Sequence, residues 1–168
     1  MLFTLVVARR GSMADPTYVQ KACAYITRGS GELLVFEGPE HDGLQIPKGT
    51  LEPGESPREA LFREVIEESG LGTLNATRHL STDVWTRRHS PPKWYVRHFF
   101  HATVYEPRDR WTHTVTDGGD EHGAEFELYW IHPSTAREFA LDLDDYVQLL
   151  PLPDRAGERN AELAAASD

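Results

Sequence analysis

The sequence contains very little cysteine and no long apolar segment. Cys23 is the single cysteine among 168 residues, so no disulfide can form within the chain. This favours a reducing compartment, and we expect a cytoplasmic protein. No apolar run approaches the roughly 20 residues that span a bilayer, so no membrane partner is expected. The apolar run near the N-terminus is short and has no basic residue ahead of it, unlike a signal peptide.

Positive charge is also scarce. The chain has 17 Lys and Arg residues against 27 Asp and Glu residues, for a formal net charge of −10. Because nonspecific binding to a long nucleic acid needs a basic surface, we expect no long nucleic acid as a partner. A phosphorylated substrate would have to be bound by a local basic patch or by metal ions.

The rest of the composition, 39% hydrophobic and 26% charged, is typical of a globular domain. We interpret residues 17–150 as one domain. Residues 1–16 are interpreted as an N-terminal extension that is partly cloning-derived, because Gly11-Ser12-Met13 resembles a cloning junction. Residues 151–168 have little to bury and are expected to be disordered. The composition allows a homodimer.

The most informative stretch runs from Gly49 to Leu71, and its middle is predicted to be a helix. Ser56 is a suitable N-cap, Pro57 suits the first helical position, and Glu59 completes a capping box. Gly70 supplies the stop. The stretch thus carries signals for both ends of a helix.

The faces of this helix differ in chemistry. At about 100° per residue, four apolar residues share an arc expected to face a core: Leu61, Phe62, Val65 and Ile66. Three acids are expected on the opposite side: Glu64, Glu67 and Glu68. Glu64 and Glu68 repel each other at i, i+4 spacing, and a cation would reverse that penalty. Oxygen ligands of this kind suit Mg²⁺.

A solvated, charged helix surface with an Arg63–Glu67 pair would explain the acids but not the glycines at both ends or Glu55. The segment resembles the Nudix box, the signature motif of the Nudix hydrolase family. Every fixed position of that motif is occupied: Gly49, Glu55, Arg63-Glu64-Val65, Glu67-Glu68 and Gly70-Leu71. The resemblance implies an α/β fold, namely an α/β/α sandwich around a mixed β-sheet.

The flanking sequence agrees with such a fold. Strands are predicted where β-branched and aromatic residues gather between turn signals: residues 17–29, 32–36, 44–46, 80–86, 93–105 and 126–131. Residues 38–43 are predicted to be a polar loop, and residues 107–124 a long one. A second helix is predicted from Pro133 to Leu150, with an apolar face that includes Phe139, Leu143 and Val147.

The resemblance also implies roles for individual residues. Glu64, Glu67 and Glu68 would bind Mg²⁺, for which Mn²⁺ could substitute. The backbone carbonyl near Lys48 would be a further ligand. Arg63 would orient the carboxylates. Glu55 would support them indirectly or bind an additional ion.

Other candidates lie outside the motif. The resemblance implies a further acid, for which Glu121 and Glu125 are the candidates, that would bind metal or act as a base, although each could be an ordinary loop acid. Glu125 is preferred because the start of a strand would hold it rigidly.

The candidates for binding substrate phosphates are basic: Lys48, Arg87, Arg88 and Lys93. Trp85, Trp94 and Tyr95 lie among the last three, so this region could bind phosphate and stack a base. The alternative is that the aromatic residues are core residues and the basic ones solvate a turn.

The sequence therefore predicts a metal-dependent pyrophosphohydrolase. By resemblance, it would cleave the diphosphate linkage of a nucleoside diphosphate linked to another moiety, a small nucleotide-like substrate. Pro47-Lys48-Gly49 is similar to hydrolases of dinucleoside polyphosphates and diphosphoinositol polyphosphates, which is a second hypothesis. The tyrosine expected near Arg88 in the former is absent, as is the proline expected near Thr86 in ADP-ribose hydrolases. A non-catalytic nucleotide-binding Nudix module is the alternative of another class, and RNA decapping would require a more basic surface.

Overall fold

The computed structural model describes residues 17–151, apart from residues 30, 88–92, 117–118 and 136. Arg88, the N-terminal extension and residues 152–168 therefore lie outside the described part. The described elements follow one another in this order: β1 (Thr17–Thr27), β2 (Leu33–Gly38), β3 (His41–Gln45), β4 (Lys48–Thr50), α1 (Pro57–Ser69), β5 (Asn75–Arg87), β6 (Lys93–Thr103), β7 (Arg110–Thr114), β8 (Glu125–Ile131) and the 3₁₀ helices η1 (Ala140–Asp142) and η2 (Val147–Leu149).

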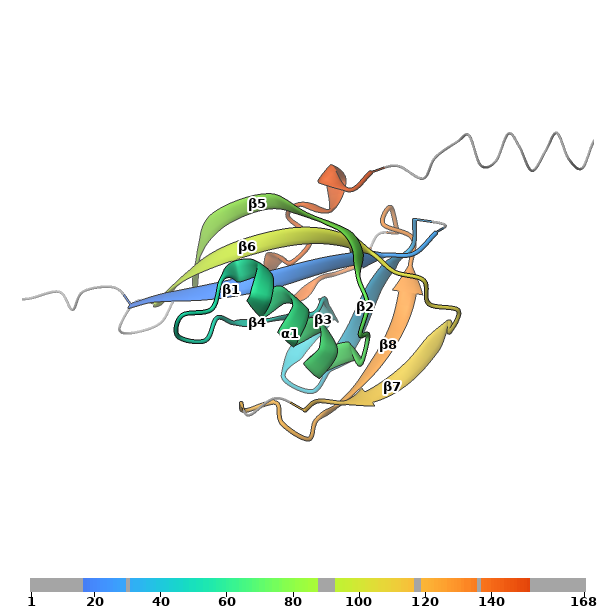
Figure 1. The fold of residues 1–168 in the computed structure, drawn as a ribbon, viewed down its shortest axis with the longest axis horizontal. Helices are drawn as coiled ribbons and strands as arrows, with labels where there is room; N and C mark the ends of the chain where they lie inside the picture. Colours follow the sequence, from blue (N-terminus) through green and yellow to red (C-terminus); the bar gives the residue numbers. More distant parts are fainter. Residues whose placement is uncertain (1–16, 30, 88–92, 117–118, 136, 152–168) are drawn as a thin grey trace, which may run out of the picture.

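The strands form one mixed sheet in the order β5-β6-β1-β2-β8-β7 (Figure 1). β1 runs parallel to β6 along its whole length, from Thr17 opposite Lys93 to Thr27 opposite Thr103. β4 pairs antiparallel with β1, and β3 pairs with β2. The short β4 therefore brings the start of the Gly49–Leu71 stretch onto the central strand of the sheet.

Two apolar clusters lie on opposite faces of the sheet. One joins α1 to the sheet through Leu61, Val65, Ala24 and Phe100. The other contains Tyr25 and Phe99 of the sheet together with Leu143 and Leu150 from the C-terminal segment. The sheet is thus covered on one face by α1 and on the other by residues 139–150 (Figure 1), which confirms the predicted α/β sandwich around a mixed sheet. In the described ranges, no helix is both long and apolar enough to cross a membrane.

The ends of α1 are those predicted. The Ser56 hydroxyl accepts from the Glu59 N–H, the Glu59 carboxylate accepts from the Ser56 N–H, and Pro57 is the first helical residue. Gly70 ends the helix with φ at 76°, and its N–H donates to the Ile66 carbonyl. This left-handed conformation costs glycine little, which is why the stop is glycine.

The helix predicted from Pro133 is wrong. The described part of this segment holds only η1 and η2, and Leu141 and Asp142 have φ angles of 54° and 53°. Tertiary hydrogen bonds take the carbonyls that a helix would use, since Tyr25 donates to the Leu143 carbonyl at 2.6 Å and Arg97 to the Leu141 carbonyl at 3.0 Å. Contacts with the sheet therefore override the helical pattern.

Two predicted loops contain strands. Residues 110–114 form β7, which pairs with β8, and residues 41–45 form β3. β7 carries few apolar side chains, so its pattern alone is weak. Its position is fixed by Trp111, which is buried against α1 and donates to the Ser69 carbonyl.

Candidate active site

The carboxylates of α1 lie partly on the face that packs against the sheet. Glu64 and Glu68 are 5% and 1% exposed, whereas Ile66, predicted to be in the core, is 49% exposed. Residues 60, 64 and 68 form one stripe of the helix beside Leu61 and Val65. The predicted separation of apolar and acidic faces is therefore wrong by about a quarter of a turn, and two acids are buried with the apolar residues.

Glu68 is fixed to β4. The backbone N–H of Lys48 donates to Glu68 Oε2 at 2.9 Å. Burial raises the pKa of Glu68 well above its usual range and outweighs the charge and the N–H of Lys48, which act to lower it. A cation bound beside Glu68 would remove this penalty.

Glu64 packs against the backbone of β4. A β-carbon at Gly49 would lie 1.8 Å from the Glu64 carboxyl carbon, far inside any permitted contact. Glycine at position 49 is therefore needed for the close approach of this carboxylate to the strand.

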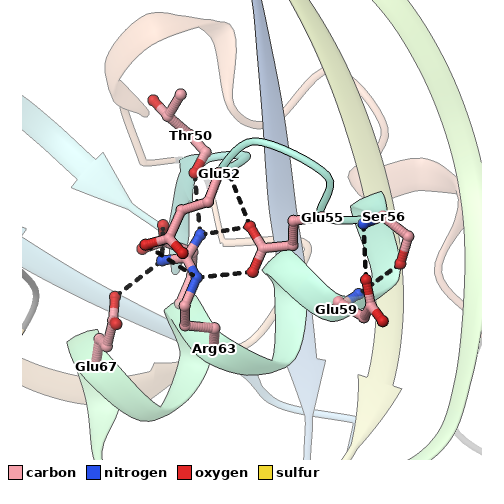
Figure 2. A network of polar contacts seen from close by, with 8 residues as sticks. Thr50, Glu52, Glu55, Ser56, Glu59, Arg63 and Glu67 are labelled. Carbon is pink, nitrogen blue, oxygen red and sulfur yellow. Dashed lines mark hydrogen bonds and ion pairs between the residues drawn. The ribbon is translucent and has the colours of Figure 1, made fainter.

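Arg63 holds the remaining acids together (Figure 2). It donates two hydrogen bonds of 2.8 Å to Glu55, one of 2.7 Å to Glu64, one of 3.1 Å to Glu67 and one of 3.0 Å to the Thr50 carbonyl. The hydrogen bonds from Arg63 lower the pKa of Glu55. A planar guanidinium can make all these bonds at once, which an ammonium cannot.

Arg63, Glu64 and Glu67 border a cavity of about 730 Å³. Its lining includes Lys48, Glu64 and Glu67 from the β4–α1 region, Lys21 from β1, and Asp120 and Glu121 from the segment before β8. Trp85 and Arg87 of β5, Tyr95 and Arg97 of β6, and Leu141 also line it. One concave site thus carries acids, basic groups and aromatic rings.

The NUDIX domain family model matches residues 17–150. The chain belongs to the Nudix hydrolase family. An RNA pyrophosphohydrolase from Photorhabdus laumondii is 39% identical over 97 residues, 58% of this chain and 54% of that protein. The chain spans about half the length of these curated relatives.

Solved structures show the same fold at low identity. A MutT protein from Methanosarcina mazei shares 19% identity over 81% of this chain and 94% of its own, with a TM-score of 0.56. The NUDIX domain of NrtR from Shewanella oneidensis was solved in complex with ADP ribose. It shares 15% sequence identity with this chain, over 85% of this chain and 88% of its own, with a TM-score of 0.56. The stretch from Gly49 to Leu71, which resembles the Nudix box, lies within the residues that the family model matches.

The structure brings together only some of the predicted site residues. Several border the cavity directly: Lys48, Arg63, Glu64, Glu67 and Arg87. Glu55 and Glu68 lie just behind the lining, through Arg63 and Lys48 respectively. Lys93 lies outside the lining, with its ammonium 5.7 Å from the centre of the Tyr95 ring.

The two candidate acids outside the Nudix box differ in position. Glu121 lines the cavity. Glu125 is exposed at the start of β8, opposite Thr114, and is not part of the lining. The preference for Glu125 therefore loses its structural support, because a rigid strand holds that side chain away from the site.

Lys21 is a cavity residue that the sequence prediction missed. Burial lowers its pKa, and the nearby charge of Lys48 lowers it further. β1 is otherwise largely apolar from Ala22 to Ile26, so a lysine at its entry to the core was the available signal.

The donor set fits a hard divalent cation. Every candidate ligand in the Nudix box is a carboxylate or a backbone carbonyl, the oxygen donors that Mg²⁺ takes. In the described ranges, no three acidic, His or Cys side chains are arranged to hold an ion. Arg63 engages Glu64 and Glu67, and the Lys48 N–H engages Glu68. A cation would share the Glu64 and Glu67 carboxylates with Arg63.

Proposed function

We propose that this Nudix chain is a metal-dependent pyrophosphohydrolase acting on the diphosphate linkage of a nucleoside diphosphate joined to another moiety. One observation carries the proposal. Acids suited to a divalent ion and lysines suited to phosphate, Lys21 and Lys48, border one cavity. Its volume of about 730 Å³ is within the usual range for small-molecule sites.

Glu64, Glu67 and Glu68 would hold the divalent ion, with Mg²⁺ preferred and Mn²⁺ as a substitute. When bound, such an ion neutralises phosphate oxygens and makes a coordinated water more acidic. Arg63 orients Glu64 and Glu67 from within the helix. Lys21 and Lys48 act as point charges on the substrate phosphates. Glu121, on the cavity wall, is the candidate to accept a proton from the attacking water.

RNA as the substrate is a second candidate, favoured by the name of the Photorhabdus relative. The formal charge of −10 counts against a long RNA-binding surface. Dinucleoside polyphosphates and diphosphoinositol polyphosphates remain further alternatives. A non-catalytic module is disfavoured because the Nudix box lacks none of its acids.

A substrate panel tests the proposal. Nucleoside diphosphate derivatives, dinucleoside polyphosphates, diphosphoinositol polyphosphates and triphosphorylated RNA are incubated with Mg²⁺, Mn²⁺ or EDTA, and phosphatase-coupled phosphate release is measured. We expect the highest kcat/KM for a nucleoside diphosphate derivative and no turnover in EDTA. Preference for RNA would replace the proposed substrate, and turnover in EDTA would exclude the metal.

Glu68→Gln is the matched variant for this assay. Its turnover should fall at least about a hundredfold, roughly 2.7 kcal/mol of barrier. Mg²⁺ should raise the Tm of the wild type, since a ligand that binds only the folded state stabilises it, but raise that of the variant much less. Normal turnover in this variant would contradict the assignment of Glu68 as a metal ligand.

A further inference from the structure

The alternation of side chains along β5 and β6 separates the aromatic residues of this hairpin. Trp85 lies opposite Tyr95, whereas Trp94 is opposite Thr86. Successive strand residues point to opposite faces, and Trp85 and Tyr95 both line the cavity. Trp94 instead contacts Tyr18, with ring centres 5.7 Å apart. Two of the three aromatic residues therefore belong to the cavity and one does not.

Trp85 is held in place by polar contacts. Its Nε1–H donates to Asp142 Oδ2 at 2.8 Å, and the Arg97 guanidinium lies 5.4 Å from the centre of its ring. The Tyr95 ring is 5.7 Å away and tilted by 50°. An aromatic wall that is already ordered loses little conformational entropy when a ligand ring stacks on it.

The backbone beside this wall is strained. Leu141, which lines the same cavity, and Asp142 both adopt the left-handed conformation, which is unfavourable for residues other than glycine. Arg97 Nη1 donates to the Leu141 carbonyl at 3.0 Å and helps to hold the turn. Strained residues of this kind gather at ligand-binding sites.

The aromatic wall lies at a defined separation from the basic groups. Lys21 lies in register with Arg97 and Asp83, and Val19 lies in register with Tyr95 and Trp85. Trp85 therefore lies two strands away from Lys21 across the sheet and two residues away along the strand direction. With standard strand spacings, the Cα atoms of Trp85 and Lys21 are roughly 12 Å apart. The sugar of a nucleoside diphosphate can bridge between phosphates at one end and a ring at the other.

We propose that Trp85, Tyr95 and Leu141 form the subsite for the planar ring of the substrate, a nucleobase. This inference rests on the proposed function, in which the phosphates bind near Lys21 and Lys48. The ring stacks on the aromatic pair, and the Leu141 side chain provides an apolar contact at its edge.

Calorimetric binding of two non-hydrolysable ligands tests the subsite. α,β-Methylene-ADP carries the ring, and methylenediphosphonate has the phosphonates alone. Trp85→Ala should lower the affinity for α,β-methylene-ADP at least about tenfold, within the range measured for a base stacked on an aromatic residue. The affinity for methylenediphosphonate should stay the same within about twofold. Trp85→Phe should restore most of the binding, because it keeps an aromatic face.

Trp94→Ala is the control, since it removes a tryptophan from the opposite face of the same hairpin. It should change neither ligand. Equal losses for both ligands in Trp85→Ala, the same loss in Trp94→Ala, or no binding of α,β-methylene-ADP to the wild type would overturn the proposal. Should Trp85→Ala fail to fold, as judged by thermal unfolding, Tyr95→Ala carries the same expectation.

The two proposals fail separately. Binding is measured without hydrolysis. If the ligand binds through its ring but the chain cleaves no nucleoside diphosphate derivative, the proposed enzymatic activity is contradicted and the proposed subsite is supported. If the chain cleaves such derivatives but Trp85→Ala does not change ligand affinity, the enzymatic activity is supported and the subsite is contradicted.

Discussion

The Glu64 carboxylate occupies the space that a side chain at position 49 would fill. Gly49→Ala should therefore displace Glu64 and lower kcat at least about tenfold, a barrier increase of about 1.4 kcal/mol. Gly72→Ala is the matched control, because a β-carbon there meets nothing within 4 Å. Steady-state kinetics of both variants checks this. Equal activities in the two would show that the close packing of Gly49 and Glu64 has no part in turnover.

Glu121 and Glu125 make a second matched pair. Glu121→Gln should lower kcat with little change in KM, because Glu121 lines the cavity and can accept a proton there. Glu125→Gln should have little effect, since Glu125 is exposed outside the lining. Full kinetics of both variants distinguishes them. If only Glu125→Gln is impaired, the preference drawn from the sequence was correct and the assignment to Glu121 is not.

Arg87 should contribute to substrate binding more than Lys93 does. Arg87 lines the cavity and Lys93 does not. Arg87→Ala is expected to raise KM several-fold with a smaller change in kcat, and the effect should weaken as salt screens the charge. The measurement is KM at low and high ionic strength for each variant. A larger effect from Lys93→Ala at low salt would contradict this arrangement.

Asp83 and Arg97 link the β5–β6 hairpin to the C-terminal segment. The Arg97 side chain is 5% exposed and makes hydrogen bonds of 2.9 and 2.6 Å to Asp83. Asp83→Asn should lower the free energy of unfolding by about 3 kcal/mol, because the buried Arg97 would keep only the partly exposed Asp145 as an acidic partner. Asp145→Asn should cost less than about 1 kcal/mol, because that side chain is 45% exposed. Urea unfolding at pH 7 measures both.

The Asp83–Arg97 pair also gives a pH dependence. Burial acts to raise the pKa of Asp83, but the hydrogen bonds from Arg97 and Tyr146 outweigh it, and the net pKa is lowered. The stabilisation is therefore complete above the ordinary Asp pKa of about 4 and is lost as the pH falls through the lower folded value. The difference in unfolding free energy between wild type and Asp83→Asn should be largest near pH 7 and shrink below about pH 4. A constant difference down to pH 3 would contradict this.

The sequence predicts the parts of the fold that local signals determine. Ser56, Glu59 and Gly70 mark the ends of α1 because caps act within a few residues. The strands with strong β-propensity, such as 93–105, were placed to within a few residues. The acids of the Nudix box can be identified from the spacing of the motif in the sequence alone.

Long-range contacts determine what the sequence did not predict. Periodicity gives the angle between helix residues but not which arc is buried, so Glu64 and Glu68 were assigned to the wrong side and Ile66 to the core. The helix expected after Pro133 is absent because Arg97, from another strand, binds the Leu141 carbonyl. Lys21 becomes a site residue only because β1 pairs with β4, which places Cys23 opposite Lys48.

The alternation of residues along β5 and β6 also limits where an aromatic side chain can stand on the cavity face of the sheet. A one-residue shift moves an aromatic side chain to the far face of the sheet, so the next position on the cavity face lies about 7 Å away along the strand. With phosphates at one end of the cavity and a ring at the other, small sequence changes along these strands could alter the accepted substrate length only in steps of that size. A different ligand length would therefore require Trp85 and Tyr95, which lie opposite each other, to move together by two residues along their strands.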